Sequence, residues 1–119
     1  MKWFAVHIIM YVKFKEKGQD HYPIWENIVL FRAKSVLSAS KKAKKYAQQE
    51  EGDSSGTFTW ENKPAKWVFA GIRKIVKCQE ENEQPTNGTE LTYSEFSVSN
   101  KSSLNKLVQG KKVTITLVD

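Results

Sequence analysis

Three residues of the sequence could act as soft metal ligands or as a nucleophile and its base: His7, His21 and Cys78. A Cys–His pair can carry nucleophilic catalysis when the fold brings the two side chains together. No pair among the three has the spacing of a helical two-histidine site or of a CxxC motif. We interpret Cys78 as a small hydrophobic residue at a strand end and His21 as part of a solvated loop. We therefore predict no catalytic residue, no metal and no cofactor.

Carboxylates are a second source of chemistry. General acid–base catalysis needs two of them in one cleft with pKa values held apart. The candidates lie beside aromatic residues or in an acidic segment: Glu26, Glu61, Glu90 and Glu95. No pair has diagnostic spacing, and the ordinary role of Glu26 in a strand is to face a Lys on a neighbouring strand. A small hydrolase-like enzyme is therefore the least favoured of three functions.

Glycine spacing excludes the common nucleotide-binding loops. The six glycines lie at least four positions apart: Gly18, Gly52, Gly56, Gly71, Gly88 and Gly110. This spacing matches neither the phosphate-binding P-loop nor the Gly-rich dinucleotide fingerprint. Nucleotide hydrolysis by a P-loop and dinucleotide binding by a Rossmann unit are thereby excluded.

Lysines are concentrated on one predicted helix, where Lys41, Lys42 and Lys45 lie opposite its alanines. Lys41 and Lys45 are four positions apart and repel each other, while Glu50 and Glu51 lie at the negative end of the helix dipole. A sequence selected only for helix stability would reverse this order of charges. The three lysines are a candidate anion-binding surface; the alternative is an ordinary solvated helix face.

Aromatic residues beside these lysines could form a base-stacking platform on a sheet. The candidates are Trp3, Tyr11, Trp25, Trp60 and Trp67. No RNP-like run of basic, glycine and aromatic residues is present, and Trp beside Phe in a strand is more often core. Because 17 of the 19 cations are Lys, bidentate recognition of phosphate or guanine, which favours Arg, is also disfavoured.

Composition limits the class of protein. The chain has 119 residues, a formal net charge of +6 and 39% hydrophobic residues, which is enough for one folded domain over residues 1–119, with a core at about 3–98. The single Cys excludes a disulfide framework. The apolar start of the chain is interrupted by His7 and is too short to span a bilayer. We expect a cytoplasmic protein with no membrane partner.

Hydrophobic periodicity predicts an α+β fold: a mostly antiparallel, twisted sheet of about five or six strands with one main helix, about 35–51, packed on one face. The order is strand, strand, helix, strand, strand, strand, then a short helix and a last strand. Ser35 is the predicted helix N-cap, and Gly71 marks a predicted bulge. The predicted strands are 3–15, 24–33, 57–61, 65–78, 89–98 and 113–118, and the short helix lies near 104–110.

The second predicted strand is apolar on both faces. Trp25, Val29 and Phe31 lie on one side and Ile24, Ile28 and Leu30 on the other. More apolar surface is present than one short helix can cover. We therefore predict a non-enzymatic protein-interaction module with Trp25, Val29 and Phe31 as a candidate interface. The partner is an unidentified protein or a second copy in a homodimer. The alternative function is nucleic-acid binding through Lys41, Lys42 and Lys45.

Four segments in this order resemble a small bacterial family known only as domain of unknown function 4288. They are Trp3-Phe4-Ala5-Val6, residues 25–35 with Ala39 and Ala43 after them, Trp67-Val68-Phe69-Ala70-Gly71, and Gly88-Thr89-Glu90 with Tyr93-Ser94. The resemblance covers residues 3–98. The lysine-rich helix and the tail beyond Asn100 depart from the pattern. The resemblance implies a compact cytoplasmic domain and no particular activity.

Overall fold

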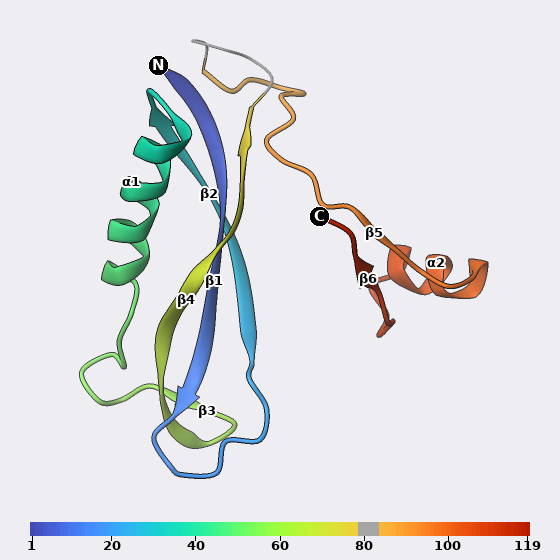
Figure 1. Cartoon of the computed structure of the whole chain (residues 1–119). Helices are drawn as coiled ribbons and strands as arrows, with labels where there is room; N and C mark the ends of the chain where they lie inside the picture. Colours follow the sequence, from blue (N-terminus) through green and yellow to red (C-terminus); the bar gives the residue numbers. More distant parts are fainter. Residues whose placement is uncertain (79–83) are drawn as a thin grey trace.

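The computed structural model describes residues 1–78 and 84–119 (Figure 1). Its main sheet has the strand order β2-β1-β4-β3, with antiparallel pairing throughout. The elements, in chain order, are β1 (Lys2–Phe14), β2 (Ile24–Ala33), α1 (Val36–Gln49), β3 (Thr59–Trp60), β4 (Lys63–Lys77), β5 (Phe96–Ser97), α2 (Lys101–Val108) and β6 (Thr116–Leu117). The predicted α+β class, with a mostly antiparallel sheet and one main helix on it, is confirmed.

Strand β1 is the centre of the core because both of its neighbours pair along nearly its whole length. Its even-numbered side chains from Phe4 to Met10 are buried beneath α1, whereas Val12 and Phe14 belong to a second cluster with Ala65. On α1 the buried residues are Ala39, Ala43 and Ala47. Alanine at these three positions lets the helix backbone approach the sheet closely, since no long side chain intervenes.

The start of α1 is fixed by the predicted cap. The Ser35 hydroxyl accepts a hydrogen bond from the backbone N–H of Ser38 at 3.1 Å, which satisfies one of the free amides of the first turn. The helix ends at Glu50, and a backbone bridge between Gly52 and Trp67 then returns the chain to β4. Gly52 has φ 139, a region that favours glycine.

The bulge predicted at Gly71 is also found. The register between β1 and β4 shifts once between His7 and Ile8 and once between Ile9 and Met10. Each shift leaves one β4 residue without a partner on β1, first Arg73 and then Ala70. A bulge breaks the alternation of side chains between the two faces. Arg73 and Lys74 therefore both reach the sheet face opposite α1, which we call the second face.

The last two strands differ most from expectation. The strands predicted over 89–98 and 113–118 are wrong along most of their length, because only Phe96–Ser97 and Thr116–Leu117 pair, and they pair with each other. Their alternating pattern predicted strands, but the sheet partner of a strand is set by long-range packing. The result is a separate two-stranded sheet beside α2. We call residues 96–118 the arm (Figure 1).

The arm extends away from the main sheet (Figure 1). Its helix α2 begins after Asn100, whose side chain accepts from the backbone N–H of Ser103 at 2.8 Å. The structure describes all of α2, and none of the residues of this helix is buried. Within the described residues, neither α1 nor α2 is long and apolar enough to cross a bilayer.

Candidate functional site

A buried histidine lies at the middle of the second face. His7 is 0% exposed, and its Nδ1 lies 2.6 Å from a carboxylate oxygen of Glu26 on β2. Its Nε2 is hydrogen-bonded to the Thr92 hydroxyl. Because a carboxylate only accepts hydrogen bonds, Nδ1 carries a proton, and in the neutral ring Nε2 accepts from the hydroxyl. His7 thus joins three segments that are distant in sequence.

This Thr92–His7–Glu26 series has the order of a hydroxyl nucleophile, a base and the acid that orients the base. Catalysis by such a series requires a substrate to reach the hydroxyl. Four surface cavities of the described chain are lined by other residues. In this structure the three side chains hold the segment that contains Thr92 against the main sheet.

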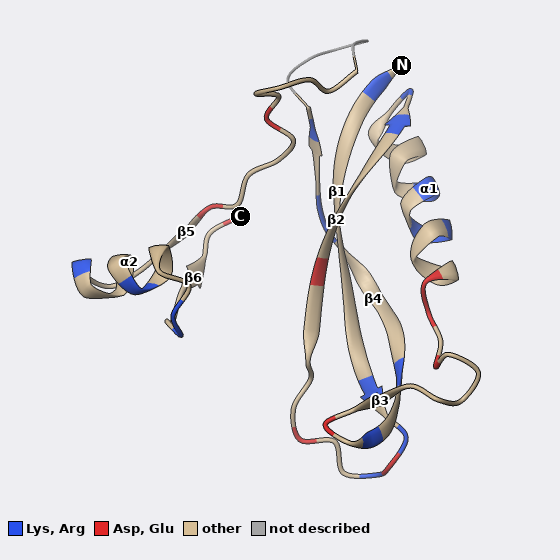
Figure 2. Ribbon diagram, turned by 180° about the vertical axis from the view of Figure 1, so that it is seen from behind, with Lys and Arg blue, Asp and Glu red and all other residues tan. Residues whose placement is uncertain are grey.

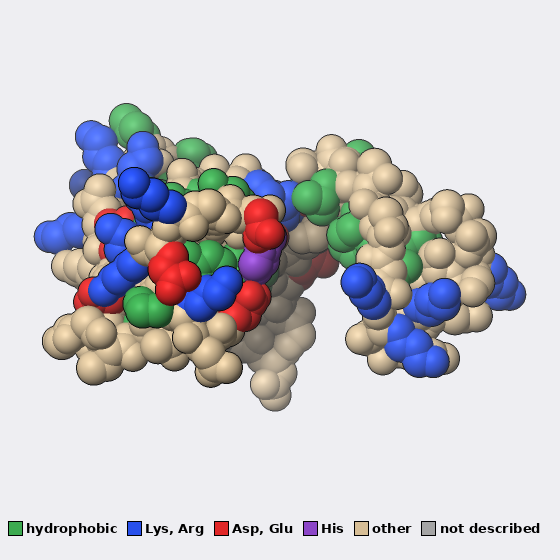
Figure 3. Space-filling model, turned by 90° about the horizontal axis from the view of Figure 1, so that it is seen from below, with side chains coloured by type: hydrophobic (Ala, Val, Ile, Leu, Met, Phe, Trp, Pro, Cys, Tyr) green, Lys and Arg blue, Asp and Glu red, His purple; other side chains and the backbone are tan. Residues whose placement is uncertain are grey.

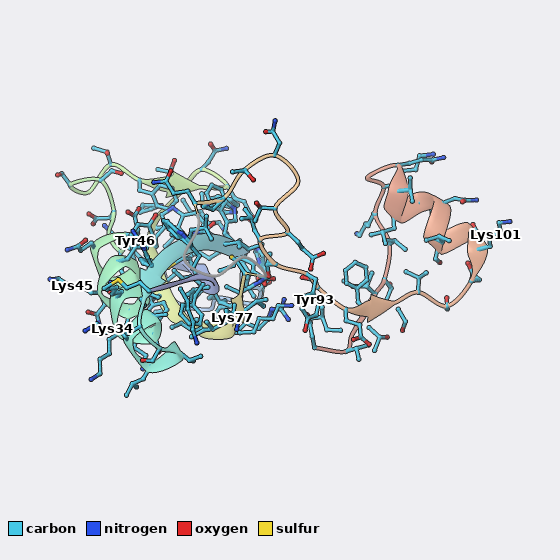
Figure 4. The ribbon with its side chains drawn as sticks, turned by 90° about the horizontal axis from the view of Figure 1, so that it is seen from above. Lys34, Lys45, Tyr46, Lys77, Tyr93 and Lys101 are labelled. Carbon is cyan, nitrogen blue, oxygen red and sulfur yellow. The ribbon has the colours of Figure 1, made fainter. Side chains whose placement is uncertain are left out.

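Arg73 and Lys74 attach the arm to the sheet. The Arg73 guanidinium donates to Glu26 through Nε at 2.9 Å and to the Asp119 carboxylate through Nη1 at 2.8 Å. Lys74 donates to the same carboxylate and to the backbone carbonyl of Tyr93. We call Arg73, Lys74 and Asp119 the anchor. It holds both ends of the arm at one point of β4; Figure 4 shows Tyr93 between the body and the arm.

Backbone hydrogen bonds reinforce the anchor. The Glu95 N–H donates to the Asp119 carboxylate at 3.0 Å, and the Val118 N–H donates to the Glu95 carbonyl at 2.9 Å. The two chain segments that connect the arm to the rest of the protein are therefore hydrogen-bonded to each other next to the main sheet. The arm is attached to the sheet at both of its ends.

Electrostatics favour the charged forms of the anchor residues. Hydrogen bonds from Lys74, then Arg73, then the Glu95 N–H hold the pKa of Asp119 far below its usual range. The hydrogen bond to Asp119, followed by the one to Glu26, raises the pKa of Arg73. Burial alone would raise the pKa of Glu26, but hydrogen bonds from Arg73 and His7 outweigh it and the pKa is lowered. All three groups are ionised at neutral pH.

Apolar side chains on the arm are exposed to solvent. Val108 is 79% exposed, and four others are at least one-third exposed: Leu104, Ile115, Leu117 and Val118. Leu104 and Val108 are four positions apart and share one face of α2. Hydrophobic side chains and lysines share the surface of the arm in Figure 3. These exposed side chains give the arm an apolar surface.

The second face of the main sheet has an apolar surface of its own. Pairing places Ile28 opposite His7 and Ile24 opposite Tyr11, so these side chains lie on the face away from α1. Ile24 is 58% exposed, Ile28 and Tyr22 are also exposed, and Tyr22 packs edge-on against Tyr11. We call Tyr11, Tyr22, Ile24 and Ile28 the isoleucine patch.

The residues predicted as an interface lie on one face of β2, but α1 covers two of them. Val29 and Phe31 are partly buried against the core beneath α1, and Phe31 packs against Tyr46 of that helix. Trp25 is 52% exposed, and its ring packs against Trp67. Trp25 is therefore the member of this set that has a large exposed surface.

The predicted anion-binding lysines belong to α1, on which the lysine positions are blue in Figure 2. Lys41, Lys42 and Lys45 are all exposed. The Lys42 ammonium donates to the backbone carbonyl of Arg32 at 2.6 Å, so it also fastens α1 to the end of β2. Lys41 and Lys45 form no ion pair with a described residue.

The other two chemical candidates have structural surroundings. Cys78 is a buried free thiol whose Sγ lies 3.4 Å from the Leu91 carbonyl, and burial raises its pKa. His21 lies in the loop between β1 and β2, paired with Asp20 and Glu61. These two carboxylates, Asp20 first, raise the pKa of His21. The structure brings neither residue to His7.

Sequence reasoning missed Thr92, Arg73 and Asp119. Thr92 lies 85 positions from His7, and nothing in the local pattern connects the two. Arg73 could have been suspected, since it is one of two arginines and lies two residues after the predicted bulge at Gly71. A residue displaced by a bulge is often directed to a special contact.

Comparison with known proteins supports the resemblance described above. Searches of curated proteins and of solved structures give no significant match. The family model described as Domain of unknown function (DUF4288) matches residues 3–93. That span includes the main sheet, α1 and Thr92, and it ends before the arm. The chain therefore belongs to the DUF4288 family.

Proposed function

We propose that this protein is a non-enzymatic protein-interaction module whose arm binds a second copy of the same chain. In the pair, the arm of each copy contacts the isoleucine patch of the other. A reducing, cytoplasmic location is part of the proposal, and the single free thiol of Cys78 is consistent with it. Complete burial of His7 supports a structural role for the series that joins it to Glu26 and Thr92.

The observation that carries the proposal is the amount of exposed surface. The chain exposes 8433 Å², whereas a compact monomer of 13.7 kDa exposes about 6,600 Å². The excess, about 1,800 Å², exceeds the roughly 800 Å² that each partner buries in a standard interface. The radius of gyration, 17.2 Å, is likewise larger than the roughly 13.5 Å of a compact domain of this length.

A second copy of the chain can cover the exposed apolar surface of the arm more readily than the main sheet of the same chain can. The anchor holds both ends of the arm at β4, so the arm cannot fold back over the isoleucine patch beside it without breaking those ion pairs. In a dimer with two-fold symmetry, each arm contacts the isoleucine patch of the other copy. The same contact therefore occurs twice in the dimer. One chain thus supplies both halves of the contact.

Charging the arm should separate the pair. In the double variant Val108→Asp/Leu117→Asp, two carboxylates would have to enter an apolar contact, which is costly without partners. We expect the dissociation constant to rise at least about 100-fold. Size-exclusion chromatography with light scattering should give twice the chain mass of 13.7 kDa for the wild type and the single mass for the variant.

The matched control is Leu37→Asp. Leu37 is 66% exposed on α1, far from the arm, and should tolerate the same change with the pair intact. A wild type that is monomeric at micromolar concentrations, or an arm variant that dimerises as tightly as the control, would refute the proposal.

Nucleic-acid binding through α1 is the second candidate function, favoured by the exposure of Lys41 and Lys45 without described carboxylate partners. Such binding would weaken steeply with salt, since each phosphate contact releases counterions. Lys41→Glu/Lys45→Glu should then reduce binding to a mixed RNA or DNA pool at least about tenfold. Lys111→Glu/Lys112→Glu on the arm is the matched control. Equal binding by the two variants would remove α1 as the contact.

A further inference from the structure

A small cavity lies where α1 ends above the sheet. It has a volume of about 90 Å³ and is lined by Met10, Trp25, Asn27, Glu50 and Trp67. Three strands and the C-cap of the helix contribute to it. In Figure 1 the helix covers one half of the sheet, and the chain leaves it as a loop that leads to β3. The cavity is independent of the arm.

Two indole rings form its walls. The ring centroids of Trp25 and Trp67 are 4.7 Å apart, with 50° between the ring planes. Trp67 also packs against Trp60 and Phe58, at centroid distances of 5.7 and 5.8 Å. The bridge between Gly52 and Trp67 fixes the helix end to the same strand. The aromatic walls are therefore set before any ligand arrives, which lowers the entropic cost of binding.

The lining of the cavity carries one negative charge, that of Glu50, although the whole chain carries +6. Glu50 is the charged residue in its lining and is the C-cap of α1, so its carboxylate adds to the negative end of the helix dipole. The last turn of α1 has no basic residue to offset this. The neighbouring Glu51 carboxylate accepts from the Phe69 N–H at 2.9 Å. Of the two carboxylates that disfavour an isolated helix, Glu50 thus lies where it can attract a cation into the cavity.

We propose that this cavity binds an N-methylated ammonium group. Aromatic faces attract cations through their quadrupoles, and methylated ammonium groups are recognised by contact with such faces. Trp25 and Trp67 pack against each other, so the group would lie in the cavity beside the pair and not between the two rings. A bare ammonium needs several hydrogen-bond acceptors, whereas Asn27 and Glu50 are the two lining residues whose side-chain oxygens can accept one. The volume is about three times the share of one water in the liquid, so it admits a compact head group and excludes the body of a larger ligand.

Two sources can supply this group: a free small molecule and a methylated lysine side chain of another protein. Choline is the probe for the first, and a short peptide with one trimethylated lysine is the probe for the second. The unmodified peptide and the uncharged tert-butyl isostere of choline are the controls for methylation and for charge. Tighter binding of the methylated peptide than of choline would assign the site to a protein side chain, and the reverse order to a small molecule.

NMR titration at constant ionic strength should show saturable shifts of the Trp25 indole N–H with choline, with a dissociation constant of the order of 1 mM. Trp25→Leu should abolish binding, and Glu50→Gln should weaken it about fivefold. Glu16→Gln, which changes an exposed carboxylate elsewhere, is the matched control. Glu50→Gln provides the test if the Trp variant does not fold. Equal binding of choline and its uncharged isostere, no saturation with either ammonium probe, or unchanged binding by Glu50→Gln would overturn the proposal.

Discussion

Replacing His7 by leucine should lower the free energy of unfolding by about 2 kcal/mol, because the Thr92 hydroxyl and the Glu26 carboxylate each lose a buried partner. For a chain of this length the change corresponds to a fall in Tm of about 8 °C. The loss of stability should affect one segment of the chain in particular as well as the whole fold. Hydrogen exchange should show earlier opening of residues 89–95, since the bond between His7 and Thr92 is one of their attachments to the sheet.

The other histidine provides the matched control for this prediction. His21 is half exposed and pairs with two exposed carboxylates, and surface pairs of this kind contribute little. His21→Leu should leave Tm nearly unchanged. If both variants lower Tm equally, or if residues 89–95 stay protected in His7→Leu, the buried histidine does not hold that segment.

Arg73→Met should release the base of the arm. Arg73 is the residue that bonds both Glu26 and Asp119, and loss of charged hydrogen bonds of this kind typically costs a factor of about 10 to 100 in an equilibrium constant. We expect limited proteolysis within residues 96–118 to become at least about tenfold faster. The dissociation constant of the pair should rise by a similar factor, because a loose arm must be ordered on binding.

The second arginine is the matched control for the anchor. Arg32 is exposed at the end of β2, and the bond from Lys42 uses its backbone carbonyl and not its side chain. In the Arg32→Met variant, limited proteolysis within residues 96–118 should therefore proceed at the wild-type rate. Equal digestion of Arg32→Met and Arg73→Met would show that Arg73 does not attach the arm.

The anchor also predicts a dependence on pH. The pKa of Asp119 is lowered in the folded protein, so its contribution is fully present above the unfolded value, about 3.9, and is lost as the pH falls through the lower folded value. Attachment of the arm should therefore persist through mildly acidic conditions. In Arg73→Met the pKa of Asp119 rises towards its usual range, and proteolysis of the arm should accelerate at a higher pH than in the wild type.

The parts of the fold that depend on local pattern could be predicted from the sequence. The alternation in β1, the Ser35 cap and the bulge near Gly71 are each governed by neighbouring residues. The last two strands could not be predicted, because residues 89–98 and 113–118 have strand periodicity but lack a long pairing partner. Periodicity reports which residues suit a strand and not which strand lies beside them.

In the candidate sites, too, the residue types could be recognised from the sequence, whereas their long-range contacts could not. His7 could be singled out by its residue type, but its partners come from β2 and from a segment 85 positions away. Trp25 and Glu50 were both noted in the sequence, one as an aromatic and one as an unfavourable helix-end charge. Their meeting in one cavity depends on the angle at which α1 crosses the sheet, which no local pattern specifies.

Isotope-filtered NMR on a mixture of labelled and unlabelled chains tests the central claim most directly. If the arm binds a second copy, methyl groups of Val108 and Leu117 in one chain should show cross-peaks to Ile24 and Ile28 of the other. A dimer without these cross-peaks, or a chain that stays monomeric under these conditions, would contradict the account.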